Sequence, residues 1–123
     1  MIFHSRSIDN VTLLNVSGRI DVTNSSDLKH KLGQIASQQS TQVIVNLAHV
    51  SFMDSSGLAV LIQGMKRCRE YGGDLLLCNL PKPVHMIFEL TRLDKAVQIF
   101  DSEHDAIAQF QTQRQPLISG LNS

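Results

Sequence analysis

Two serines stand side by side in the segment Asp54-Ser55-Ser56-Gly57, directly before an amphipathic helical pattern. Asp54 or Ser55 is predicted to cap this helix, because both residue types accept hydrogen bonds from the unpaired N–H groups of a first turn. If Asp54 is the cap, Ser55 and Ser56 are the first two helical residues, and the Ser56 hydroxyl is expected to face solvent. The positive end of the helix dipole would stabilise a phosphate on that serine. The same four residues are also a good capping sequence with no further role, so both interpretations stay open.

The other residues with chemical potential form no catalytic or metal-binding pattern. Five histidines are scattered along the chain, none at ligand spacing from a second histidine or a cysteine pair: His4, His30, His49, His85 and His104. We therefore expect no metal site and no cofactor. A phosphate-binding glycine loop, a dinucleotide-binding glycine pattern and the G-x-S-x-G nucleophile motif are all missing. A triad of Ser56, His49 and Asp54 could be drawn, but most polar chains offer one, so we do not expect an enzyme.

Composition limits the class of protein. The chain has 123 residues, of which 42% are hydrophobic and 18% charged, which predicts one globular domain. Lys plus Arg and Asp plus Glu both number 11, and this balance argues against nucleic-acid partners, which require excess basic charge. No apolar run approaches the ~18 residues of a membrane span, and the first ten residues contain no signal-peptide core. We therefore expect a cytoplasmic protein without a membrane partner, in which Cys68 and Cys78 are buried and reduced.

The elements that must position the two serines follow from the hydrophobic pattern. Strands are predicted over 2–8 and 11–17, joined by a tight turn at Asp9-Asn10. Apolar residues at helical spacing then predict a helix through Leu28, Leu32, Ile35 and Ala36. A short buried strand is expected over 43–45, followed by a connection over 47–53. The next helix uses Leu58, Leu61, Ile62 and Met65 as its buried face.

The remainder of the chain continues the alternation of strands and helices. A buried strand is predicted over 75–78, a short helix begins at Pro83, an edge strand lies within 97–100, and a last helix begins at Ser102. This order indicates an α/β domain, a mixed β-sheet flanked by about four helices. The domain is predicted to span 1–110, and residues 111–123 are expected to be a flexible polar tail.

The motifs together resemble one known family. The D-S-S-G segment lies within residues 45–61, and the next strand is bounded by 71–73 and by Cys78-Asn79. The form G-x-[LI]-D is found at Gly18-Arg19-Ile20-Asp21, and a helix that ends in a leucine-containing turn is found at 84–93. In this order they resemble the STAS domain, and more narrowly its anti-sigma factor antagonist type. The resemblance covers roughly residues 1–110, and it implies the same α/β fold.

The resemblance also implies a partner-switching regulator without enzymatic activity. In the family, the unphosphorylated antagonist binds an anti-sigma factor that is also a serine kinase with a GHKL-like ATPase fold. The kinase phosphorylates a serine, the antagonist dissociates, and a PP2C-type phosphatase restores it. The phosphorylated position corresponds to Ser56, and the surrounding partner-binding loop corresponds to Asp54, Ser55 and Gly57. A second partner-binding loop corresponds to Asp21, Thr23 and Asn24.

Other functions are compatible with the same domain. It could be an accessory STAS subunit of an ABC-type lipid transporter, although those members often lack the serine found here at Ser56. It could also be a stressosome-type scaffold, but nothing in the sequence indicates assembly with larger chains. A neighbouring gene for a small kinase of the ATPase fold would favour the switch, and neighbouring permease genes would favour the transporter.

Overall fold

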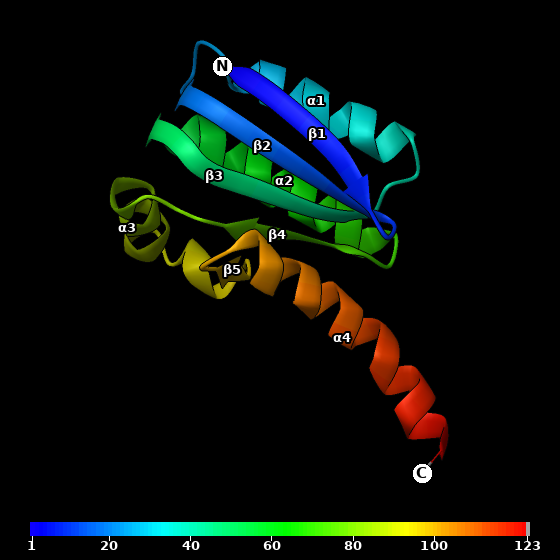
Figure 1. Ribbon diagram of the computed structural model, residues 1–123. Coiled ribbons are helices and arrows are strands. Elements are labelled where there is room, and N and C mark those ends of the chain that lie inside the picture. Colours follow the sequence, from blue (N-terminus) through cyan, green and yellow to red (C-terminus); the bar gives the residue numbers. More distant parts are fainter. Residues whose placement is uncertain (123) are drawn as a thin grey trace.

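The fold is one five-stranded sheet whose strands follow each other in space in the order β1-β2-β3-β4-β5 (Figure 1). The computed structural model describes residues 1–122, and it describes side chains through residue 112. Helices alternate with the strands after the first hairpin, which confirms the predicted α/β class. The elements are β1 Ile2–Ile8, β2 Val11–Ile20, α1 Ser25–Ser37, β3 Gln42–Met53, α2 Ser55–Glu70, β4 Asp74–Cys78, α3 Lys82–Leu90, the short 3-10 helix η1 Leu93–Lys95, β5 Ile99–Phe100 and α4 Glu103–Asn122.

The first two strands form an antiparallel hairpin, and all later pairs of strands are parallel. The hairpin turns at Asp9 and Asn10, whose φ angles are +48° and +69°. Positive φ at both central residues is the conformation that matches the twist of the flanking strands, which explains why a short polar pair stands here. The predicted tight turn is confirmed.

Two apolar layers form because the strands alternate their side chains between the two faces of the sheet. On one face, Leu14, Val45 and Leu77 pack with residues of α1, α2 and α3. On the other face, Leu13, Ile44 and Leu76 pack with Ala106 and Phe110 of α4. The helices α1 and α2 therefore share one side of the sheet, as Figure 1 shows, and α4 covers part of the other side.

The predicted connection over 47–53 is wrong, because β3 continues without interruption from Gln42 to Met53. Its second half pairs with the end of β2, which itself continues to Ile20 instead of ending at Ser17 as predicted. Register shifts occur between Asn15 and Ser17 and again between Gly18 and Arg19. These irregularities break the period-two alternation of buried residues, which is the signal by which a strand is recognised in a sequence.

Helix α4 extends beyond the predicted domain end at residue 110 and runs to Asn122. Residues 111–122 are thus helical, and their predicted flexibility stays a prediction. Side chains from residue 113 onward, including Leu117 and Ile118, lie outside the described part of the structure.

Deletion of residues 114–123 is expected to change the melting temperature by no more than a few degrees. The contacts that hold α4 to the sheet lie earlier, because Ala106 and Phe110 are 0% and 1% exposed. Thermal unfolding followed by circular dichroism measures the effect, and Phe110→Ala is the matched control, with an expected cost of about 3–5 kcal/mol. A large drop for the deletion alone would place a stabilising contact in the deleted segment.

Candidate functional site

Asp54 organises the start of α2. Its backbone is extended, with φ −105° and ψ −173°, and its side-chain Oδ1 accepts hydrogen bonds from the backbone N–H groups of Ser56 at 2.9 Å and Gly57 at 3.4 Å. These are the second and third helical residues, whose N–H groups have no partner inside the helix. Asp54 is therefore the N-cap, and Ser55, the other predicted cap, is the first helical residue instead.

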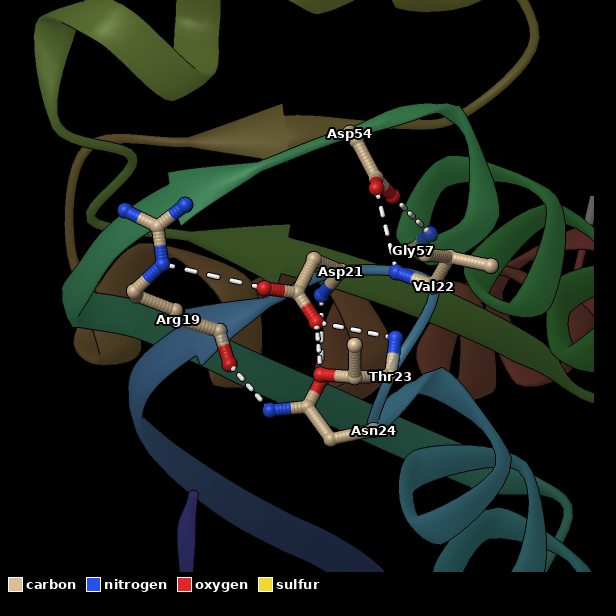
Figure 2. A network of polar contacts seen from close by, with 7 residues as sticks. All are labelled: Arg19, Asp21, Val22, Thr23, Asn24, Asp54 and Gly57. Carbon is tan, nitrogen blue, oxygen red and sulfur yellow. Dashed lines mark hydrogen bonds and ion pairs between the residues drawn. The ribbon is translucent and has the colours of Figure 1, made fainter.

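The same carboxylate also links two loops that are far apart in the sequence. Its Oδ2 accepts a hydrogen bond from the backbone N–H of Val22 at 3.1 Å, and the Asp54 N–H donates to the carbonyl of Ile20 at 3.1 Å. Figure 2 shows the Asp54 carboxylate pointing toward both Val22 and Gly57. The loop after β2 and the start of α2 are thus joined into one surface at the carboxyl ends of the parallel strands.

Asp21, Thr23 and Asn24 form a compact network within the loop that follows β2 (Figure 2). Asp21 Oδ1 accepts from the Thr23 hydroxyl and from the Thr23 N–H at 3.0 Å, while Arg19 Nε lies 3.7 Å from Asp21 Oδ2. Asn24 accepts from the Asp21 N–H at 2.9 Å and donates to the Arg19 carbonyl at 2.8 Å. Hydrogen bonds from Thr23, assisted by the charge of Arg19, hold the pKa of Asp21 below its usual value. Asp21 therefore stays ionised at neutral pH.

The exposure of Ser56 differs from the expectation that its hydroxyl faces solvent. Ser55 is exposed, whereas Ser56 is half-buried. Within the described residues, neither hydroxyl has a hydrogen-bond partner, and only the backbone N–H of Ser56 is engaged, by Asp54. The side chain that caps α2 is that of Asp54, so Ser55, the alternative cap, is not used for capping.

Gly57 permits a close approach between α2 and the ends of two strands. A Cβ at this position would lie 2.7 Å from Cγ2 of Ile20 and 2.9 Å from Cγ of Met53. Both neighbours are buried, so neither can move aside without disturbing the core. Gly57 therefore fixes the distance at which the two serines stand from the loop after β2.

Three residues beside the serines were not predicted from the sequence. Val22 is 75% exposed, Phe52 is 39% exposed, and the guanidinium of Arg19 lies 4.3 Å from the centre of the Phe52 ring. An exposed valine in a polar loop is a weak sequence signal. Phe52 was assigned to a connection, and only its place on β3 beside Arg19 shows that it contributes to this surface.

The arrangement does not provide a metal centre or a membrane segment. Among residues 1–122, no three histidine, cysteine or acidic side chains are grouped so that they could hold a metal ion. No described helix is long and apolar enough to cross a membrane. Both cysteines are free and buried, and burial raises the pKa of Cys68 to about 11 and that of Cys78 to about 12. Their thiols therefore stay protonated at neutral pH.

Comparison with known proteins places these features in a family. The family model described as the STAS domain matches residues 3–106. The chain belongs to the STAS domain family. This match includes all of the sheet except Ile2, the loops at 21–24 and 54–57 that form the Asp54-centred surface, and the first turn of α4.

The relatives of this STAS domain have names of one kind. It is 34% identical over 91 residues to the anti-sigma-B factor antagonist of Bacillus subtilis, covering 74% of this chain and 83% of that protein. It is 28% identical over 102 residues to the anti-sigma F factor antagonist of Paenibacillus polymyxa, and this match covers 82% of this chain and 87% of that protein.

Solved structures share the fold. Those of SpoIIAA from Bacillus, an anti-sigma factor antagonist, match in the unphosphorylated form with a TM-score of 0.78 and in the phosphorylated form with 0.69. Each is 22% identical to this chain; the matches cover 90% of this chain and 97% of SpoIIAA in the first form, and 89% and 99% in the second.

Asp54→Ala is expected to destabilise the STAS domain by up to about 2 kcal/mol, the upper end for loss of an N-cap. The reason is that the carboxylate accepts from three backbone N–H groups, including that of Val22 on a different loop. Urea denaturation measures the change. Asp27→Ala, which removes an exposed carboxylate from the first turn of α1, is the control and should cost no more than about 0.5 kcal/mol. Equal effects of the two variants would contradict the linking role of Asp54.

Proposed function

We propose that this STAS domain is an anti-sigma factor antagonist, controlled by phosphorylation of Ser56. The unphosphorylated form binds an anti-sigma factor that is also a serine kinase with a GHKL-like ATPase fold, and thereby frees the target of that factor. Phosphorylation of Ser56 releases the antagonist, and a PP2C-type phosphatase restores it in the cytoplasm. The observation that carries the proposal is the unpartnered Ser56 hydroxyl at the start of α2, in a chain whose relatives are named as antagonists of anti-sigma factors.

The surface around Ser56 supports binding of a protein partner. Asp54 joins the start of α2 to the loop that carries Asp21, Thr23 and Asn24, so this loop lies beside Ser55 and Ser56, with the buried Gly57 beneath them. The surface contains an exposed apolar side chain, Val22, between polar groups. An apolar centre surrounded by polar side chains is the usual composition of a protein interface. The relatives' names do not favour the alternatives of a transporter subunit or a stressosome scaffold.

Phosphorylation of Ser56 would act at the interface and leave the fold intact. A phosphate adds about −1.5 to −2 charges at neutral pH, which the positive end of a helix accommodates. A partner that covers Ser56 would have to bury this charge against surfaces shaped for a hydroxyl. Burial of an unmatched charge costs several kcal/mol, and each 1.4 kcal/mol corresponds to about tenfold in affinity. The penalty is therefore large enough to separate the two proteins.

The proposal is tested by phosphorylation with purified kinases of this fold from the same genome. Incubation with ATP and Mg²⁺ is expected to add one phosphate to the intact protein, and fragmentation should locate it on Ser56. Ser56→Ala should take up no phosphate, whereas Ser55→Ala should be phosphorylated like the parent. Modification of Ser55 instead, or of neither serine by any of these kinases, would contradict the proposed site.

A further inference from the structure

A hollow lies between α1 and α2, on the side of these helices away from the Asp54-centred surface. It has a volume of about 210 Å³, and it shares lining residues with a second hollow of about 320 Å³ that is also lined by Tyr71. The floor of the first is apolar, made by Leu32, Val43 and Leu75. An apolar cavity of about 150 Å³ already holds a molecule the size of benzene, so this one has room for a short hydrocarbon chain.

The hollow exists because α1 has a glycine where a larger side chain would fit. A Cβ at Gly33 would have nothing nearer than the guanidinium Nη1 of Arg67, at 4.0 Å. Gly64, on the facing helix, is different, because a Cβ there would lie 3.1 Å from Leu32 and 3.2 Å from Leu75. Close packing of the two helices thus explains why residue 64 is a glycine, but it does not explain the glycine at position 33. Glycine is unfavourable inside a helix, and its presence at position 33 leaves the space open.

Two positive side chains stand at the mouth of this hollow. Lys29 and Arg67 both line it, and Arg67 also lines the second hollow and a third, shallower one on the outer side of α1. In the described part of the chain, neither side chain forms an ion pair or hydrogen bond. The arginines at positions 6, 19 and 69, in contrast, each pair with a carboxylate. The site therefore combines an apolar interior with unneutralised positive charge at its entrance.

We propose that the hollow binds the free carboxylate form of a medium-chain fatty acid. Its hydrocarbon chain would occupy the space beside Gly33, and its carboxylate would lie between Arg67 and Lys29. A planar guanidinium can donate two parallel hydrogen bonds to one carboxylate. A fatty acid has a single carboxylate at the end of a narrow hydrocarbon chain, so it fits both the charged entrance and the apolar interior. The site is independent of the switch, because none of its lining residues belongs to the loops at 21–24 and 54–57.

The test is calorimetric titration of the full chain with decanoate below the concentration at which it forms micelles. Saturable binding of one decanoate per chain is expected, with amide shifts in nuclear magnetic resonance spectra confined to α1, α2 and the strands beneath them. Decyltrimethylammonium, which has the same chain length and the opposite charge, should not bind. Arg67→Gln should weaken decanoate binding at least about tenfold, or about 1.4 kcal/mol. Arg92→Gln, which removes an exposed arginine outside the hollow, should leave the affinity unchanged.

Gly33→Leu is expected to fill the space and abolish binding while the melting temperature is maintained, because leucine is a stronger helix former than glycine. If this variant does not fold, Arg67→Gln and the cationic surfactant still decide the question. Absence of saturable decanoate binding, equal affinity in the parent and Arg67→Gln, or equal binding of the cationic surfactant would each overturn the proposal.

Discussion

Leu61→Asp is expected to unfold the domain, or to destabilise it by more than about 4 kcal/mol. Leu61 is 1% exposed and lies in the main core, on the face of α2 that packs against the sheet. The variant loses the burial of a leucine, which contributes about 1.5–3 kcal/mol, and leaves a cavity. It also places a carboxylate in the apolar core, and an isolated buried charge costs more than the rest of the change. Natural domains are stable by only about 5–15 kcal/mol, so this loss is close to the whole.

Gln63→Asp is the matched control, because it introduces the same residue into the same helix at an exposed position. It should melt within a few degrees of the parent, with circular dichroism as the measurement. If Leu61→Asp melted like Gln63→Asp, the orientation of α2 on the sheet would be wrong. The helical spacing alone predicts this orientation, and Leu58, Leu61 and Met65 are indeed buried, while Ile62 is half-buried at the edge of the core.

The local patterns predicted most of the fold. Apolar residues at helical spacing located α1 and α2, because each of these helices buries one face. Continuous apolar runs located β4 and the first half of β3, because these strand segments are buried on both faces. The second half of β3 was missed for a physical reason. It pairs with β2 through two register shifts, so its buried residues, Leu47, Val50 and Met53, recur every third position and resemble neither periodicity.

The sequence predicts the parts of the site that depend on neighbouring residues, and it does not predict the contacts between distant loops. A cap at Asp54 follows from residue type and spacing, and the structure has it. The second role of Asp54, in which it accepts from the Val22 N–H, depends on the pairing of the ends of β2 and β3, and no local pattern contains that information. The partial burial of Ser56, whose hydroxyl was expected to face solvent, was missed for the same reason. Its surroundings include the loop after β2, which is more than 30 residues away in the sequence.

Ser56→Asp is expected to weaken binding to the proposed partner kinase at least about tenfold, or about 1.4 kcal/mol, whereas Ser56→Ala keeps the affinity of the parent. The carboxylate reproduces part of the charge of a phosphate and fewer of its acceptor oxygens, so its effect should be smaller than that of phosphorylation. Neither variant should lower the melting temperature. A negative side chain in the first turn of a helix is stabilising, and alanine is a strong helix former. The loss of affinity would then arise at the interface and not from unfolding.

Ser7→Asp is the matched control for charge. Ser7 is exposed on β1, where it pairs with Thr12 at the start of β2, so it lies at the end of the sheet opposite to Ser56. Calorimetric titration of the kinase into the parent and the three variants should therefore divide them into two groups. The parent, Ser56→Ala and Ser7→Asp should bind alike, and Ser56→Asp should bind weakly. Equal affinity of all four would remove the switch, because a charge at the start of α2 would then have no effect on the partner. Equal weakening by Ser7→Asp would instead mean that the kinase responds to net charge, and that the surface joined by Asp54 is not where it binds.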